Sequence, residues 1–369
     1  MAVRCGIVGL PNVGKSTIFN ALTAAGAEMA NYPFCTIEPN QGMVAVNDPR
    51  LDALTALVRP KRTLPAVMEF LDIAGLVRGA SKGEGLGNQF LGHIRQVEAV
   101  AHVVRCFIND DITHVHDRVD PLHDILVIDT ELMLADLAAL ERRHKTIAQK
   151  ARFGDKETKD LAALYETVMQ GLNDGIPVRR QKLTDAEREA LKELFLLTAK
   201  PVMYVCNVDE KEVANAQIPG RHPLVDAVRK ISAEEGAGVV AICGVIEAEI
   251  AELNAEERTA FLADLGLEES GLDRLVRSAF HLLGLMTYFT VGPQEVRAWT
   301  IPQKSTAYDA AGVIHTDFQR GFIRAEVIAY KDFMASGGEQ GAKEKGLLRV
   351  EGRDYPMVDG DILHFRFNV

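Results

Sequence analysis

Short apolar runs, each followed by a polar or glycine-containing turn, recur through the first two-thirds of the chain. They occupy residues 3–8, 42–46, 67–71, 101–107, 201–206 and 239–243. Runs of this length are typical of strands that are buried on both faces, as in a parallel sheet. Segments with helical spacing separate them. The pattern therefore predicts an α/β fold with a mostly parallel, doubly wound sheet and helices on both faces.

A long tract with helical periodicity interrupts this alternation between about residues 120 and 200. Apolar residues recur there every seven positions, at Leu126, Met133, Leu140 and Ile147. This heptad spacing predicts an inserted hairpin of two helices packed as in a coiled coil. The tract also holds a basic run with no acidic residue inside it: Arg142, Arg143, Lys145, Lys150 and Arg152. Such a run is either a solvated helix face or a surface for RNA or a ribosome.

The pattern changes again near residue 285, where short alternating or apolar segments are separated by proline and glycine. These segments predict a small β-rich domain. We therefore expect a first domain over residues 1–283, with the helical insertion at 120–200, and a second domain over residues 284–369. The second domain shows no catalytic constellation.

Composition and charge restrict the classes of function. Of the 369 residues, 47% are hydrophobic and 25% are charged, as in soluble globular proteins. The formal net charge of −11 disfavours non-specific nucleic-acid binding by the whole surface. There is no run of 18 apolar residues, and the five cysteines are scattered without a C-x-x-C pair. We expect a cytoplasmic protein without a membrane partner, a disulfide framework or a zinc site.

The first apolar run leads directly into the strongest chemical signal in the chain. Gly9-x4-Gly14-Lys15-Ser16 fits the phosphate-binding P-loop, with a predicted strand before it and a predicted helix after it. In this motif backbone N–H groups and the helix N-terminus favour phosphate. Lys15 supplies a charge for the β- and γ-phosphates, and the Ser16 hydroxyl is a candidate Mg²⁺ ligand. The sequence therefore predicts a nucleoside triphosphate site.

Two further segments resemble the switch regions of nucleotide hydrolases. Thr36 lies in a proline-bounded loop, where a threonine can close on Mg²⁺ and the γ-phosphate. The run at 67–71 ends in Asp72-x-x-Gly75, which predicts water-mediated contact of Asp72 with Mg²⁺ and a γ-phosphate contact from the Gly75 N–H. Leu76 stands where Ras-type GTPases place a water-orienting glutamine, and a leucine side chain cannot polarise water. Either hydrolysis is slow or another group supplies the geometry of attack. The glycine-rich segment 76–88 that follows is expected to be a switch loop.

The base-binding segment leaves the identity of the nucleotide open. GTPases carry Asn-Lys-x-Asp after this strand, whereas this chain has Asn207-Val208-Asp209-Glu210. The lysine stem that covers guanine is absent, and the final carboxylate is one methylene longer, so the logic of guanine recognition is weakened. His114, in the loop after the run at 101–107, could position water or remain merely solvated.

Taken together, these motifs resemble the Obg-like ATPases, the YchF subfamily of the Obg-related (TRAFAC class) P-loop NTPases. The match is carried by segments 9–17, 31–40 and 72–90, by Asn207-x-x-Glu210, and by segments 314–318 and 321–325. It covers essentially the whole chain. The resemblance implies that the second domain is a β-grasp (TGS) module that contacts the nucleotide domain or a partner.

The resemblance also implies a preference for ATP and roles for particular residues. Adenine would lie among Phe107, Asn207 and Val208, near Glu210. The phosphates would contact Asn12, Val13, Gly14, Lys15, Ser16 and Thr17. Mg²⁺ would be held by Ser16 and Thr36, and His114 would replace the missing glutamine. Asn12 matches an asparagine that relatives use to hold K⁺, so K⁺ is a second candidate cation.

We therefore expect a Mg²⁺-dependent ATPase that is slow alone. Its switch loops would report the nucleotide state to a ribosome or another RNA-containing partner. The proposed catalytic set is Lys15, Thr36, Asp72, Gly75 and His114. Two alternatives stay open: a GTPase of the Obg class, and a binding module that uses ATP as a ligand and hydrolyses it incidentally.

Overall fold

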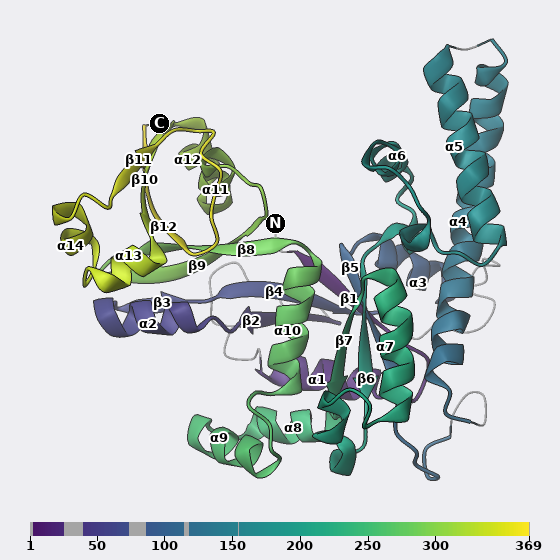
Figure 1. Ribbon diagram of the computed structural model, residues 1–369, viewed down its shortest axis with the longest axis horizontal. Helices are drawn as coiled ribbons and strands as arrows, with labels where there is room; N and C mark the ends of the chain where they lie inside the picture. Colours follow the sequence, from purple (N-terminus) through teal and green to yellow (C-terminus); the bar gives the residue numbers. More distant parts are fainter. Residues whose placement is uncertain (1–2, 26–39, 74–85, 114–117, 154, 369) are drawn as a thin grey trace. The chain divides into compact units, whose positions relative to one another are not determined.

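The computed structural model describes residues 3–25, 40–73, 86–113, 118–153 and 155–368 (Figure 1). The chain divides into two compact units. One comprises Val3–Gly42 and Glu69–Ser278, and the other comprises Met43–Met68 and Ala279–Val369. Each is described below by itself. No helix in the described ranges combines the length and the hydrophobicity that a membrane span needs.

A six-stranded sheet with the order β2-β4-β1-β5-β6-β7 forms the centre of the larger unit, and most of β2 and the first residues of β4 fall in segment 43–68, which is grouped with the smaller unit. The strands of this sheet are β1 (Arg4–Val8), β2 (Gln41–Val46), β4 (Ala66–Asp72), β5 (Ala99–Arg105), β6 (Val202–Asn207) and β7 (Gly238–Ile242). The neighbours from β4 through β7 all pair in parallel, which confirms the predicted parallel α/β sheet. Because parallel strands end at one edge, the segments that follow β1, β5, β6 and β7 meet there.

Three helices lie between these strands in the chain: α1 (Lys15–Ala25), α3 (Leu86–Arg95) and α7 (Pro223–Glu235). Three more follow β7: α8 (Gly244–Glu252), α9 (Ala255–Asp264) and α10 (Gly271–Leu282). Their ends follow local rules. In α7, Pro223 occupies the first turn, and the His222 side chain caps the Val225 N–H. Gly236 ends the same helix in the left-handed conformation that glycine adopts without a steric penalty.

The tract at 120–200 forms α4 (Pro121–Ala151) and α5 (Lys156–Asn173), which run side by side (Figure 1). After α5 come η3 (Val178–Arg180), α6 (Asp185–Leu191), η4 (Lys192–Leu194) and η5 (Leu197–Ala199). Met133, Leu140 and Val168 are buried in a shared apolar cluster. Leu126, the first of the heptad positions, is exposed instead, so this packing begins at Met133. Supercoiled packing of the two helices stays a prediction.

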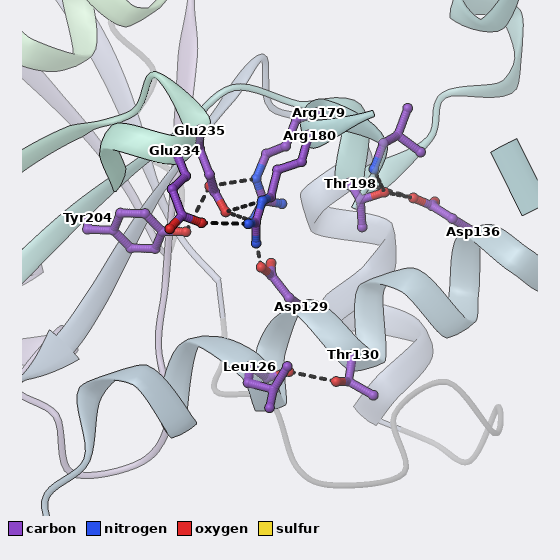
Figure 2. A network of polar contacts seen from close by, with 11 residues as sticks. Leu126, Asp129, Thr130, Asp136, Arg179, Arg180, Thr198, Tyr204, Glu234 and Glu235 are labelled. Carbon is purple, nitrogen blue, oxygen red and sulfur yellow. Dashed lines mark hydrogen bonds and ion pairs between the residues drawn. The ribbon is translucent and has the colours of Figure 1, made fainter. Parts of the chain in front are cut away.

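Buried polar contacts fasten the base of this hairpin to the sheet (Figure 2). Arg179 of η3 donates to Asp129 of α4 at 2.6 Å and to Glu235 of α7 at 3.0 Å. The Tyr204 hydroxyl on β6 donates to the same Glu235 at 3.0 Å. Because burial disfavours a carboxylate, the pKa of Asp129 is raised despite the nearby arginine.

A second anchor lies about two helical turns farther along α4. Asp136 accepts from the Leu197 N–H at 2.7 Å and from the Thr198 N–H at 2.8 Å, both at the start of η5. The Thr198 hydroxyl donates to it at 2.7 Å. α4 is thus held at two depths along its base by side chains that are themselves buried.

The smaller unit has its own six-stranded sheet, in the order β11-β10-β12-β8-β9-β3. The strands are β3 (Arg62–Leu64), β8 (Leu285–Val291), β9 (Glu295–Pro302), β10 (Phe322–Ala329), β11 (Arg349–Glu351) and β12 (Asp361–Phe367). β12 and β8 pair in parallel at the centre, and β3 pairs in parallel with β9. The other neighbours are antiparallel. Tyr288, Val327 and Leu363 form its core with α11 (Ala307–Ile314).

Short helices complete this unit: α12 (Thr316–Arg320), α13 (Tyr330–Ala335), α14 (Glu339–Glu344) and α2 (Pro49–Val58). α2 and β3 come from segment 43–68, far from the rest of the unit in sequence. α2 packs against β8, β9 and α13. Its Arg50 donates to Asp359 at 2.6 Å and lies over the Phe289 ring at 5.4 Å. The expected boundary at residues 283 and 284 makes no provision for this segment, and that division of the chain stays a prediction.

Candidate nucleotide-binding site

The segment between β1 and α1 has the backbone of a phosphate-binding loop. Asn12 and Gly14 have φ values of 63° and 91°. Gly14 cannot be replaced easily, because a Cβ there would lie 2.0 Å from the Asn207 Nδ2 atom. The helix α1 begins at Lys15, and the Ser16 and Thr17 side chains at its N-terminus are exposed. This end of a helix favours an anion.

The fold brings Lys15 and Asp72 together from two separate motifs. The Lys15 ammonium and the Asp72 carboxylate form a hydrogen-bonded ion pair, in which the two side chains are 10% and 17% exposed. Asp72 ends β4, and its N–H donates to the Asn40 carbonyl at 2.8 Å. The two groups expected to act on the γ-phosphate and on Mg²⁺ are therefore neighbours.

Asn207, at the end of β6, connects the P-loop to the start of α8. Its Nδ2 donates to the Val13 carbonyl at 2.9 Å, and its Oδ1 accepts from the Gly244 N–H at 3.0 Å. The side chain is 6% exposed. Both ends of the amide are thus bonded to backbone groups, so Asn207 connects the P-loop at Val13 to the first residue of α8.

A cavity of about 340 Å³ lies at this edge of the sheet. Seven residues expected at the nucleotide line it: Asn12, Gly14, Thr17, Phe107, Asn207, Val208 and Glu210. Six further residues line it too: Asn109, Ile112, Asp209, Cys243, Gly244 and Val245. Val13 is fully buried beneath the loop, and Lys15 and Ser16 lie outside this lining.

The far wall of the cavity is apolar in its depth and acidic at its rim. Val208 is buried, and its N–H donates to the Ile242 carbonyl at 2.8 Å. Asp209 and Glu210 are exposed, and Asp209 accepts from the Lys211 N–H at 3.1 Å. Within the described ranges no protein group bonds to the Glu210 carboxylate, which leaves it available to a ligand. Burial raises the pKa of the Cys243 thiol against the opposing hydrogen bonds from the Ile246 and Val245 N–H groups, with smaller contributions from the charges of Glu210 and Asp209, so the thiol stays neutral.

Several expected residues cannot be placed. Thr36, Gly75 and His114 lie outside the described residues, as do Leu76 and the glycine-rich segment as far as residue 85. Their roles stay predictions. The last described residue before His114 is Thr113, whose carbonyl accepts from the Asn12 Nδ2 at 3.1 Å.

The residues present suit Mg²⁺ held together with a nucleotide. Mg²⁺ takes oxygen ligands, usually one or two from protein with the rest from phosphate and water. The exposed Ser16 hydroxyl and the Asp72 carboxylate are oxygen donors beside the anion-binding end of α1. No group of three or more His, Cys, Asp or Glu in the described part of the chain could hold a metal by itself. The donor set therefore fits a cation that is bound mainly through phosphate.

Comparison with known proteins decides the family. The family model described as a 50S ribosome-binding GTPase matches residues 4–128. The YchF-GTPase_C model, described as a protein of unknown function, matches residues 285–368. The chain is 57% identical to the protein named ribosome-binding ATPase YchF from Haemophilus influenzae and 53% identical to the one from Bacillus subtilis, over all 369 residues and the full length of each relative. The chain belongs to the YchF family.

A solved YchF structure has the same fold. The Schizosaccharomyces pombe protein, 36% identical, superposes with a TM-score of 0.88 and covers 99% of this chain, which covers 97% of it. That protein is named a YchF GTPase, whereas the bacterial YchF proteins are named ATPases. The names of YchF relatives thus agree on a nucleotide hydrolase and differ on the base.

Proposed function

We propose that this chain is a Mg²⁺-dependent ATPase that acts as a nucleotide-dependent switch on a ribosome. The observation that carries this proposal is the continuity of the site. Asn12, Gly14 and Thr17 of the P-loop line the same cavity as the segments after β5, β6 and β7. A nucleotide can therefore place its phosphates on the loop and its base in the cavity.

The chemistry at the phosphates rests on charge and orientation. Loop N–H groups and the α1 N-terminus hold the phosphate oxygens, and Lys15 exchanges its contact with Asp72 for the β- and γ-phosphates. Mg²⁺, held by Ser16 and through water by Asp72, would neutralise charge on those oxygens. Thr36 and the Gly75 N–H complete the proposed set around the γ-phosphate. His114 is the proposed group that orients water, because the Leu76 side chain cannot. We attribute the proposed slow turnover without a partner to this leucine, which stands in place of the usual glutamine.

The base is read by the segment after β6. The free Glu210 carboxylate can accept from the N6 amino group of adenine or from N1–H and the 2-amino group of guanine. The buried Val208 replaces the lysine stem that GTPases lay over guanine. The names of the bacterial relatives favour ATP. An Obg-class GTPase is the alternative.

Calorimetric titration of nucleotide-free protein with ATP and with GTP, both with Mg²⁺, tests this assignment. We expect ATP to bind at least tenfold more tightly, which corresponds to about 1.4 kcal/mol. The titration is repeated with Glu210→Gln, which keeps the size of the side chain and removes its charge. GTP binding that is tenfold tighter in the wild type, and lost in Glu210→Gln, would instead identify Glu210 as the reader of guanine.

The ribosome partner is supported by the relatives' names, by an exposed basic run on α4 and by the architecture of the smaller unit. The basic run on α4 is exposed at Arg142, Arg143, Lys145 and Lys150. In the smaller unit, a central parallel pair of strands with α11 packed against the sheet supports its assignment as a TGS-type β-grasp module. A ribosome partner places the protein in the cytoplasm.

K⁺ beside Asn12 stays part of the proposal, since the amide oxygen of that residue is a suitable ligand.

A further inference from the structure

Arg105 is a fully buried cation directly beside the base cavity. It is the last residue of β5 and pairs in register with Asn207 at the end of β6. Its side chain is among the largest in the protein with almost no exposure, at 1%. Arginine is rarely buried to this degree unless its donors are paired.

The guanidinium N–H groups of Arg105 donate to backbone carbonyls of the loop that follows it. Nε donates to the Phe107 carbonyl at 3.2 Å, Nη2 to the Asn109 carbonyl at 3.0 Å and Nη1 to the Ile112 carbonyl at 2.9 Å. The guanidinium also lies over the Phe107 ring, with Cζ 4.5 Å from the ring centre. The loop is therefore wound around one planar cation.

The same three residues form one wall of the cavity. Phe107, Asn109 and Ile112 all line it. Because their carbonyl groups point to Arg105, the loop keeps these backbone acceptors away from the cavity. The P-loop holds the end of this wall through the bond from Asn12 to the Thr113 carbonyl. The wall is thus fixed from inside by Arg105 and from the phosphate side by Asn12.

Only arginine can make this set of contacts. A lysine ammonium is a point charge without the planar fork, so it cannot reach three separated carbonyls and also stack on Phe107. Burial lowers the pKa of the guanidinium, and the negative charge of Asp124 on α4 opposes that effect. A guanidinium group is not deprotonated in proteins, so the charge that supports the three carbonyl bonds is retained.

We propose that Arg105 is a positioning residue for base recognition, which holds the Phe107–Ile112 wall in the shape that receives the purine. This inference rests on the proposed function, in which the cavity takes the base of ATP. Without the Arg105 fork the wall becomes mobile, and its ordering must occur on binding. The entropy lost when the wall becomes ordered weakens the binding of ligands that carry a base, and it does not affect the binding of phosphate alone.

The test compares ATP with inorganic tripolyphosphate, both with Mg²⁺, by calorimetric titration. The full-length wild type, Arg105→Lys and Arg105→Gln are titrated with each ligand, and thermal unfolding is recorded for each protein. Arg118→Lys is the matched control, because Arg118 is exposed and pairs only with Asp120 in the described part of the chain. We expect both Arg105 variants to bind ATP at least tenfold more weakly and tripolyphosphate within twofold of wild type.

Each other result has a definite meaning. Unchanged ATP affinity in a folded Arg105 variant overturns the inference and leaves the proposed function intact. Equal weakening for both ligands, or failure of both variants to fold, also overturns it, since Arg105 would then support the whole domain rather than the wall. If wild type binds ATP no more tightly than tripolyphosphate, the base does not use the cavity and the proposed function fails first.

Discussion

His102 lies in the middle of β5, where its ring is 2% exposed and its centre is 5.8 Å from that of the Tyr204 ring. Burial, with a smaller contribution from the charge of Arg179, lowers the pKa of His102 to about 3. The folded chain therefore keeps this imidazole neutral, whereas the unfolded chain protonates it below its ordinary value of 6.5. The stability that depends on neutral His102 is complete above pH 6.5 and is lost as the pH falls from 6.5 towards 3.

We expect His102→Leu to flatten this pH dependence. Between pH 7.5 and pH 5.0 the wild type should lose about 2 kcal/mol more free energy of unfolding than the variant, because only its unfolded state gains the proton at this position. Urea unfolding at the two pH values measures the difference. Parallel losses in the two proteins would show that His102 is not the group responsible.

At the scale of single residues, the sequence pointed to those residues that stand at fixed positions in a known motif. The P-loop positions, Asp72 and the segment after β6 could be found because their spacing carries the chemistry. Arg105 could not, because an arginine at the end of an apolar run is ordinarily a charge that reaches solvent. Its role depends on three carbonyl groups that only the folded loop brings together. Asn207 was expected beside the base, but sequence gives no sign of its two backbone partners.

Among the elements, the hairpin base offers a matched pair of neighbouring arginines (Figure 2). The Arg179 side chain is 8% exposed and pairs with Asp129 and Glu235, whose side chains are 12% and 2% exposed. The Arg180 side chain is 35% exposed, and its closest partner is Glu234, at 53%. A cation removed from the first site leaves buried carboxylates uncompensated. Removal of Arg180 costs less, because water can replace it at Glu234, while Glu235, 3.9 Å from its Nε, keeps its closer contact with Arg179.

We expect Arg179→Met to lower the free energy of unfolding by about 3–5 kcal/mol and Arg180→Met by less than about 1 kcal/mol. Urea unfolding of the full chain at neutral pH measures both. Because the two positions are adjacent and the substitution is the same, the effects of helix propensity and side-chain volume largely cancel. Similar losses in the two variants would contradict the buried network as the anchor of the hairpin.

The free end of the hairpin carries a test of the ribosome proposal. Phe153 is 96% exposed, next to the exposed Arg152. An aromatic ring beside a cation can stack on an unpaired RNA base while the cation contacts phosphate. We expect Arg152→Glu with Phe153→Ser to reduce co-sedimentation with ribosomes at least fivefold in ATP and to leave ATP hydrolysis without ribosomes unchanged.

The control for that experiment uses another exposed cation and another exposed phenylalanine of the same tract. Lys192→Glu with Phe195→Ser changes charge and hydrophobicity equally, at a position where Phe195 is 67% exposed. Loss of ribosome binding in both double variants would show a general effect of charge. Retention of binding in the Phe153 variant would exclude the tip of the hairpin as the contact.

The hairpin itself was predictable because heptad periodicity is a long and redundant signal. Its length of 31 residues in α4 and 18 in α5 gives many chances to observe the repeat. The point at which the packing begins was not predictable. Leu126 fits the repeat but is exposed, since the repeat reports spacing and not which turn of the helix meets a partner.

At the scale of the whole molecule, the parallel sheet and the β-rich C-terminal part follow from local patterns, but the composition of the two units does not. Segment 43–68 has an apolar strand, a helix and another strand, like every other part of the α/β alternation. Nothing within it indicates that α2 packs against β8 and β9. That pairing is set by the match of surfaces more than two hundred residues apart, which single-sequence periodicity cannot show.

This discontinuous unit affects the chain while it is being made. Leu51 and Leu54 of α2 are buried in the finished protein, and β3 pairs with β9. Their partners β8 and β9 begin at residues 285 and 295, about 230 residues later, which at ~5–20 residues per second is roughly 12–46 seconds. Through that interval the nascent chain carries an uncovered apolar helix and an open strand edge, the two features most prone to wrong pairing between neighbouring chains. The C-terminal residues thus end a period of exposure that begins near residue 50.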